Sequence, residues 1–189
     1  MTTQINLIDL SQTYSLQEYE ALPDDGNIYA LLEGKLLLSP PPGDEHGSVA
    51  NLLATFLTVH VRAKRLGKVW SNSRFVIERK ENKDTELAPD VAFIAHPDVP
   101  VSSPGAVPIP PHFVLEVQSP GDSGPGVIAK VRKYQKAGVK LIWVIQSSKQ
   151  LAAVYHQTDQ QPVTIQPDGE LDGEYVIPGF RLKLSELFS

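Results

Sequence analysis

The sequence predicts a mixed α/β (α+β) fold, in which helices pack on a central sheet. Three observations support this fold class. Apolar residues recur at helical spacing from Val49 to Leu66. Short runs of β-forming residues alternate with this segment and with a second helical segment, 126–137. Leu141–Ile145 is nearly all apolar, which is typical of a strand that is buried on both faces. Because the sequence shows no repeat and no linker, we expect residues 1–189 to form a single domain.

The N-terminal part of the chain predicts a short helix, a hairpin and a long helix. Ser15-Leu16-Gln17-Glu18 is a capping box that opens a helix ending before Pro23. Strands Asn27–Leu32 and Lys35–Ser39 follow, and Glu33-Gly34 joins them as a two-residue turn. Pro40-Pro41-Pro42-Gly43 then breaks the chain. We expect the long helix to end with Gly67 as its C-cap.

The remaining elements are mostly strands. Two strands, Lys68–Glu78 and Leu87–Ala95, precede a loop from His96 to Pro111 that contains six prolines. A strand at Phe113–Gln118 ends at Ser119-Pro120-Gly121, and the helix at 126–137 ends at Gly138. After the buried strand, Leu151–His156 and Val163–Gln166 form a C-terminal hairpin, and Ser185–Phe188 forms a short turn.

The composition excludes several classes of protein. The absence of cysteine excludes disulfides, thiolate metal sites and cysteine nucleophiles. No apolar run reaches the roughly 18 to 20 residues of a membrane span. No signal peptide is recognisable either, so we expect a cytoplasmic protein with no membrane partner. A net charge of −5 argues against nonspecific coating of DNA. Segments 60–68 and 127–140 nevertheless contain cations and no acid, so each is either a DNA-facing surface or a solvated helix face.

Two carboxylates stand in strand-like segments. Asp90 directly follows Pro89, near the start or the edge of a strand, where a carboxylate must be paired, exposed or bound to metal. Alternatively, Asp90 caps a turn. Glu116 lies within an apolar run and shares a strand face with Gln118. The alternative is that this polar face of the strand is in contact with water.

One lysine of the second helical segment is expected to face the sheet. Helical spacing places Lys130 beside an apolar stripe formed by Val127, Val131 and Tyr134. The other cations of this helix, Arg132, Lys133 and Lys136, are expected on its far side. Two carboxylates and a lysine are what a metal-dependent phosphodiesterase requires. Alternatively, Lys130 extends along the margin of the core, with its ammonium group in water.

The order of these residues resembles the PD-(D/E)xK nuclease superfamily. Its pattern appears here as Pro89-Asp90 followed by Glu116-x-Gln118, with Gln118 in the usual place of the lysine. In some branches of that superfamily the lysine has moved to the next helix, and Lys130 fits that variant. Further motifs resemble the Uma family of restriction-endonuclease-like proteins over nearly the whole chain: Tyr14–Tyr19, Ser39–Pro42 with His46, Glu116–Pro120, Lys130–Tyr134, Ala137–Val139, Trp143–Ile145 and Val176–Phe180.

The resemblance implies a restriction-endonuclease-like fold with N-terminal and C-terminal hairpins, and a metal-dependent endonuclease that hydrolyses DNA phosphodiester bonds. By the same resemblance, Asp90, Glu116 and the Val117 carbonyl would bind Mg²⁺, with Mn²⁺ as a substitute. Lys130 would orient or deprotonate the attacking water and stabilise charge on the phosphate, and Gln118 would position Lys130 or the water. Cleavage of a duplex would suit a homodimer.

Three further residues are candidates for contacts around the site or with the substrate: Glu33, His46 and Tyr134. Members of the family often carry a glutamate where this chain has Ala30, so Glu33 is a candidate to replace it. For His46, the alternative is a histidine in a surface loop. For the whole protein, the alternative function is a catalytically inactive nucleic-acid-binding or regulatory module that retains the nuclease fold. The choice between DNA and RNA also stays open.

Overall fold

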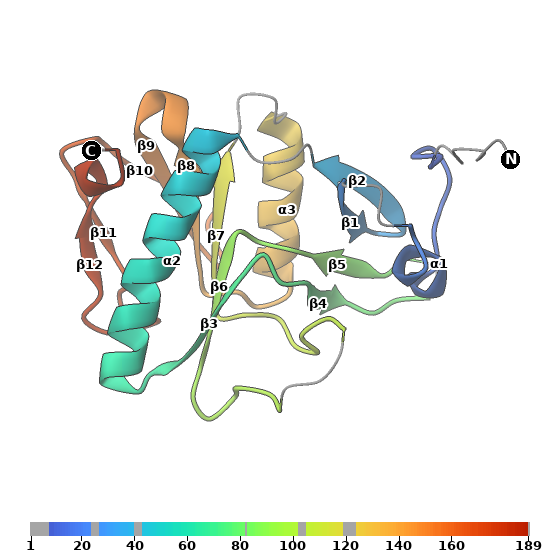
Figure 1. The fold of residues 1–189 in the computed structure, drawn as a ribbon, viewed down its shortest axis with the longest axis horizontal. Coiled ribbons are helices and arrows are strands. Elements are labelled where there is room, and N and C mark those ends of the chain that lie inside the picture. The colour runs from blue at the N-terminus through green and yellow to red at the C-terminus, as the bar shows by residue number, and fades with distance from the viewer. Residues whose placement is uncertain are drawn as a thin grey trace, which may run out of the picture.

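The computed structural model describes residues 8–23, 27–39, 43–81, 83–101, 105–118 and 124–188. In these residues the helices are α1 (Leu16–Glu20), α2 (Asp44–Lys64) and α3 (Gly124–Lys136), with short 3-10 turns η1 (Ser147–Lys149) and η2 (Leu184–Leu187). The strands are β1 (Ile28–Leu32), β2 (Lys35–Ser39), β3 (Gly67–Ser71), β4 (Phe75–Glu78), β5 (Thr85–Leu87), β6 (Val91–Ala95), β7 (Phe113–Gln118), β8 (Leu141–Gln146), β9 (Leu151–His156), β10 (Val163–Ile165), β11 (Glu170–Asp172) and β12 (Arg181–Lys183). Figure 1 shows their arrangement.

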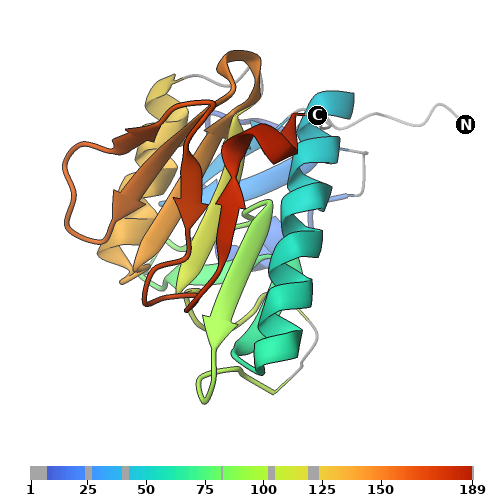
Figure 2. The same cartoon turned by 90° about the vertical axis from the view of Figure 1, so that its left-hand side faces the viewer.

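A six-stranded mixed sheet forms the centre of the molecule, with strand order β10-β9-β8-β7-β6-β3. β7 and β8 are parallel, and the other neighbours in this sheet are antiparallel. α2 packs on one face of the sheet and α3 on the other (Figures 1 and 2). β8 is buried from Leu141 to Ile145, as its apolar sequence predicted. This layout confirms the predicted fold class, a mixed sheet between helices.

The two faces of β7 take part in different cores. Leu115 and Val117 pack with α2 and the C-terminal segment, whereas Val114 packs with Val131 and Tyr134 of α3. Because side chains alternate along a strand, Glu116 lies on the same face as Val114 and therefore under α3. The strand thus presents a carboxylate to the interior between sheet and helix.

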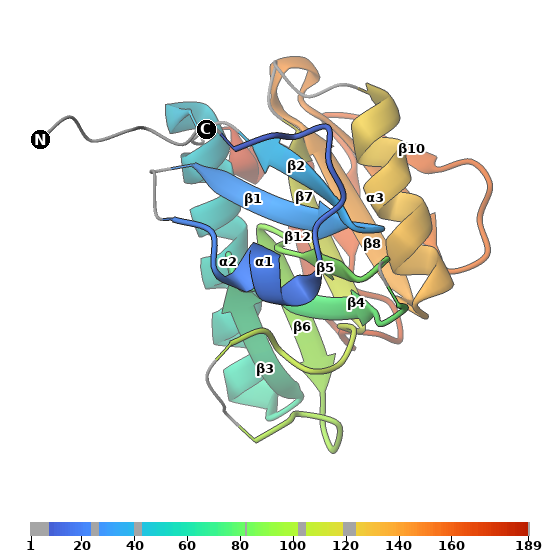
Figure 3. The same ribbon diagram turned by 90° about the vertical axis from the view of Figure 1, so that its right-hand side faces the viewer.

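The N-terminal elements form a smaller sheet with strand order β2-β1-β5-β4. The predicted hairpin is confirmed: β1 and β2 pair in register from Ile28–Ser39 to Leu32–Lys35. The capping box at Ser15 and Glu18 is present at the start of α1. This sheet packs against the α3 side of the large sheet, so α3 lies beside the hairpin (Figure 3).

The structure corrects the ends of the long helix. α2 begins at Asp44, five residues before Val49, and its first turn holds Asp44 and Glu45, where acids interact favourably with the helix dipole. The helix ends at Arg65, which adopts a left-handed conformation with φ of 54°. Gly67 is therefore not the C-cap. It begins β3, where an added Cβ would overlap the backbone of β6.

Two predicted strands are each divided between the sheets. Lys68–Glu78 becomes β3 in the large sheet and β4 in the small one, and Leu87–Ala95 becomes β5 and β6. The antiparallel pair β11–β12 was not predicted. Residues 40–42 of the expected proline break, the expected strand end at Ser119-Pro120-Gly121, and Pro104 of the long loop lie outside the described residues. None of the described helices combines the length and the apolar character needed to cross a membrane.

Candidate active site

Asp90 and Glu116 lie where β6 and β7 separate. The antiparallel pairing of β6 and β7 ends at Val91 and Leu115. If this register is continued by one residue, Asp90 lies opposite Glu116. The Asp90 carboxylate reaches across to β7, where its Oδ2 accepts a hydrogen bond of 2.6 Å from the Val117 backbone N–H. The N–H and C=O groups of a strand residue face the same neighbouring strand, so the Val117 carbonyl is directed to the same side as Asp90. The structure therefore places the Asp90 carboxylate against the backbone of Val117, next to Glu116 in the chain.

Two side chains of α3 hold the Glu116 carboxylate. Lys130 Nζ donates to Oε2 at 3.0 Å, and the Tyr134 hydroxyl donates to Oε1 at 2.6 Å. Lys130 and Tyr134 are four residues apart, which places them on one face of the helix. Helical spacing thus predicted correctly that Lys130 faces the sheet.

Burial changes the acid–base properties of this group. Removal from water raises the pKa of Glu116 above its ordinary value, the Lys130 ammonium opposes this shift, and the charge of Asp90 adds to it. The pKa of Tyr134 is raised well above its ordinary value, first by burial and then by the neighbouring Glu116 charge. Tyr134 is therefore a neutral hydrogen-bond donor at physiological pH.

His46 lies beside the first carboxylate. Its Nε2 is 2.9 Å from Asp90 Oδ1, and the two side chains are only 17% and 16% exposed. The histidine comes from the first turn of α2, so the alternative of a surface-loop histidine is wrong. With the Val117 N–H on the other oxygen, Asp90 is held at both ends of its carboxylate.

Glu33 belongs to a different group of charges. Its carboxylate, 56% exposed, accepts a hydrogen bond of 2.6 Å from Lys133, which also bonds Glu78 at 3.0 Å. Lys136 bonds the other oxygen of Glu78 at 3.1 Å. The hydrogen bond from Lys133 lowers the pKa of Glu33. Lys133 is therefore not on the solvated far side of α3, because its ammonium joins α3 to the small sheet.

The two cationic segments differ in how much of their charge is neutralised. On α3, Lys133 and Lys136 pair with acids, and Arg132 donates to the carbonyl oxygens of Asp159 and Gln160. At the end of α2, Arg62, Lys64 and Arg65 are exposed, and none forms an ion pair within the described part of the chain. Arg62 lies about 24 Å along the helix axis from His46, at 1.5 Å per residue. This end of α2 is a cationic surface that is available to a polyanion.

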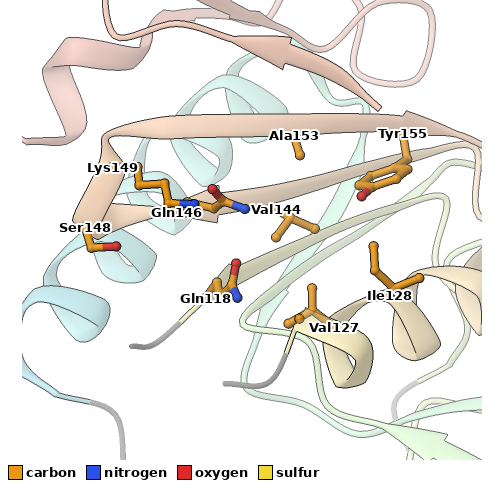
Figure 4. A pocket seen from close by; sticks show the side chains of 10 residues that line it. Gln118, Val127, Ile128, Val144, Gln146, Ser148, Lys149, Ala153 and Tyr155 are labelled. Atoms are coloured by element: carbon orange, nitrogen blue, oxygen red, sulfur yellow. The ribbon is translucent and has the colours of Figure 1, made fainter. Parts of the chain in front are cut away.

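Gln118 lies at the end of β7, on the same strand face as Glu116. Its side chain lines a cavity of about 370 Å³ between α3 and the sheet (Figure 4). Gln118 was predicted from the sequence, whereas Gln146 and Tyr155, which line the same cavity, were not. Gln146 could have been noticed in the sequence, because it also ends an apolar strand. Its position beside Gln118, however, depends on the parallel register of β7 and β8.

Carboxylate and carbonyl oxygens are the donor types that a small divalent cation such as Mg²⁺ prefers. Among the described residues, no group of three or more histidine, cysteine, aspartate or glutamate side chains is placed to hold a metal ion. The chain would therefore supply two carboxylates and a backbone carbonyl. Mg²⁺ is commonly held in this way, by one or two carboxylates that leave positions for water and phosphate. Each carboxylate oxygen already accepts one hydrogen bond but keeps a further lone pair for a metal.

Comparisons with known proteins identify the family and the fold of this chain. Residues 16–185 match the Uma2 family, described as "Putative restriction endonuclease". The structure is also similar to the crystal structure of "a putative nuclease belonging to DUF820" from Anabaena variabilis, with a TM-score of 0.80 and 21% sequence identity. The alignment covers 92% of this chain and 97% of that one, and at this identity it shows the fold. No curated protein matches the chain. The chain therefore belongs to the Uma2 family and shares the fold of that crystal structure.

Proposed function

We propose that this protein is a metal-dependent endonuclease that hydrolyses phosphodiester bonds of DNA. The observation that supports this most strongly is the meeting of Asp90, Glu116 and Lys130, with Lys130 Nζ 3.0 Å from Glu116, in a chain of this family. Two carboxylates at neighbouring strand ends with an adjacent ammonium group suit phosphoryl chemistry.

The metal would be held by Asp90, Glu116 and the Val117 carbonyl. Mg²⁺, or Mn²⁺ in its place, supplies Lewis-acid stabilisation of phosphate charge and a bound water of lowered pKa. The hydrogen bonds from His46 and Tyr134 fix the orientation of the two carboxylates. Such contacts behind metal ligands typically raise metal affinity.

The chain's own cation would stabilise the negative charge that develops at the scissile phosphate. Lys130 donates a hydrogen bond to Glu116, and the positive charge of its ammonium group would stabilise a phosphate oxygen or orient the attacking water. Because this ammonium is held on α3 before substrate arrives, no reorganisation is needed when charge develops. Gln118, on the same face of β7, would position Lys130 or the water.

The exposed cations at the end of α2 support a nucleic-acid substrate. Arg62, Lys64 and Arg65 lie roughly seven base-pair steps from the site, if DNA ran parallel to the helix at 3.4 Å per step. They would contact the backbone at a distance from the cut. Because two sites are needed to cut both strands together, we also propose that the active form on duplex DNA is a homodimer. Light scattering would measure the oligomeric state of the protein with and without a DNA duplex.

The direct test is cleavage of plasmid and single-stranded DNA with Mg²⁺ or Mn²⁺. We expect cutting that requires metal and falls at least about 100-fold in Asp90→Asn, Glu116→Gln and Lys130→Met. Asp168→Asn, an exposed acid outside the site, is the matched control and should cut normally. A folded wild-type protein that cuts no DNA substrate, or site variants that cut as well as the control, would refute the proposal.

Metal binding has a readout independent of catalysis. A ligand that binds only the folded state raises its stability in proportion to the logarithm of ligand concentration. We expect millimolar Mn²⁺ or Mg²⁺ to raise the melting temperature of the wild type and of Asp168→Asn. Asp90→Asn should lose that increase. An equal increase in all three proteins would place the ion elsewhere.

A further inference from the structure

A cavity adjoins the proposed catalytic group, and Gln118 borders both. It opens between α3 and the ends of β7 and β8, and its lining includes Gln118, two residues from Glu116 on the same strand face. The apolar walls include Val144, Val127 and Ile128, and Figure 4 shows these side chains turned toward the same space. Its volume of about 370 Å³ is in the range of small-molecule sites.

The polar side chains that line this cavity include Gln118, Gln146 and Tyr155. Gln118 and Gln146 are register partners in the parallel pair β7–β8, so their side chains stand next to each other on one face. Tyr155 of β9 lies farther along the same cavity (Figure 4). Within the described part of the chain, the side-chain amides of Gln118 and Gln146 and the hydroxyl of Tyr155 make no hydrogen bond. An apolar pocket with a few convergent and unpaired polar groups is the usual form of a specific ligand site.

We propose that this cavity binds one unpaired nucleobase of the nucleic acid, next to the scissile phosphate. The proposal rests on the proposed nuclease function, because the pocket and the Glu116–Lys130 pair share one face of β7 and one helix. A base is flat and apolar on its faces, which matches the walls at Val144 and Ile128, and polar at its edge, which matches the paired amides. In a duplex the faces of each base are stacked on its neighbours and cannot contact these walls, so the base would come from single-stranded DNA or be turned out of the stack.

Adenine is the base that fits best. A glutamine amide can donate to one atom and accept from another, and this pattern matches N7 and N6 of adenine. Lys149, at the rim of the cavity, can pair with a phosphate of the same nucleotide. Guanine is most often recognised by a bidentate arginine, and the described lining of this cavity contains no arginine.

Binding can be tested without metal or catalysis. dAMP and 2-deoxyribose 5-phosphate, which lacks the base, are titrated by NMR into metal-free wild type, Gln146→Leu and Gln157→Leu. Gln157 is an exposed glutamine outside the cavity and serves as the matched control. We expect dAMP to bind wild type and Gln157→Leu about tenfold more tightly than the sugar phosphate, and Gln146→Leu to lose that preference. Equal binding of the two ligands by wild type, or unchanged dAMP binding by Gln146→Leu, would overturn the proposal.

A cleavage measurement separates this proposal from the nuclease proposal. Single-stranded oligonucleotides carry adenine, another base or an abasic site at each position near the cut. We expect wild type to prefer adenine at one position, and Gln146→Leu to cut all substrates equally. Cutting that never depends on the base would refute the pocket and leave the nuclease standing. If the protein binds dAMP more tightly than the sugar phosphate but cuts no substrate, the nuclease proposal would be refuted and the base-pocket proposal would stand.

Discussion

The hydroxyl of Tyr134 donates a hydrogen bond of 2.6 Å to Oε1 of Glu116 in the interior between α3 and β7. Both side chains are removed from solvent, and burial raises the pKa of each. Lys130, one turn earlier on α3, holds the other oxygen of the same carboxylate. The helix therefore fixes both oxygens of the acid that we propose as a metal ligand, and it does so from a single face.

Replacing Tyr134 with phenylalanine tests this relationship. The change removes one hydrogen bond to a buried carboxylate and leaves the ring in place, so we expect stability to fall by about 1.5–3 kcal/mol. Urea unfolding at pH 7 measures the difference. Tyr175→Phe, at a tyrosine that is 69% exposed, should cost little and serves as the control. Equal effects at the two positions would mean that the Tyr134–Glu116 bond contributes no net stability.

His46 should control metal affinity through Asp90. Its ring nitrogen lies 2.9 Å from Asp90 Oδ1, and loss of a partner behind a metal ligand typically weakens metal binding about 10–100-fold. In His46→Phe we expect the Mn²⁺ concentration for half-maximal cleavage to rise by that factor. Glu45→Gln changes an exposed side chain in the same first turn of α2 and should leave the midpoint unchanged. An unchanged midpoint in His46→Phe would show that this contact does not orient the ligand.

Substitution of Glu33 tests whether the N-terminal hairpin contributes to stability or to catalysis. Its exposed carboxylate pairs with Lys133, so we expect Glu33→Gln to cost no more than about 1 kcal/mol of stability. We also expect it to reduce cleavage far less than Asp90→Asn does. Lys133→Met should cost more stability, because it leaves both Glu33 and Glu78 without their partner. Loss of all cleavage in a folded Glu33→Gln would instead make Glu33 part of the catalytic site.

The chemistry-bearing residues were easier to predict than the path of the chain between them. Asp90, Glu116 and Lys130 stand out because charged groups in apolar segments need a partner, and helical and strand spacing are enough to predict which way each one points. His46 and Tyr134 were candidates for contacts around the site, but the sequence did not predict which acid each one contacts. Their contacts with the two acids depend on how α2 and α3 pack on the sheet, and local sequence patterns do not predict this packing.

The division of strands between two sheets was not predictable in the same way. Residues 68–78 have β-forming composition throughout, so nothing local shows that the chain leaves the large sheet after Ser71 and enters the small one at Phe75. The cavity beside Gln118 was missed for a similar reason. It exists because β7 and β8 are parallel neighbours, and strand order is a tertiary property.

Two glycines should respond in opposite directions to alanine. An added Cβ at Gly67 would overlap the Ile94 carbonyl and lie 2.8 Å from Ala95 Cα, so Gly67→Ala should cost more than about 2 kcal/mol. Gly47 lies inside α2 with nothing within 4 Å of the new methyl group, so Gly47→Ala should add up to about 1 kcal/mol. Thermal unfolding of both variants measures this. A stable Gly67→Ala would mean that β3 and β6 are less closely apposed.

His156 should make stability depend on pH above neutrality. Its two ring nitrogens lie 2.9 Å from Glu174 and 2.7 Å from Asp159, and these hydrogen bonds, that to Glu174 first, raise the pKa of His156 above 6.5. The folded state therefore binds the His156 proton more tightly than the unfolded state does. The stability that this protonation contributes is complete below pH 6.5 and disappears as pH rises through the folded pKa. We therefore expect the stability advantage of wild type over His156→Asn, from urea unfolding between pH 6 and 9, to shrink with rising pH. His96→Asn, at an exposed histidine without an ion pair in the described residues, should show no such trend. An advantage that stays constant over this range would mean that His156 acts by packing rather than by charge.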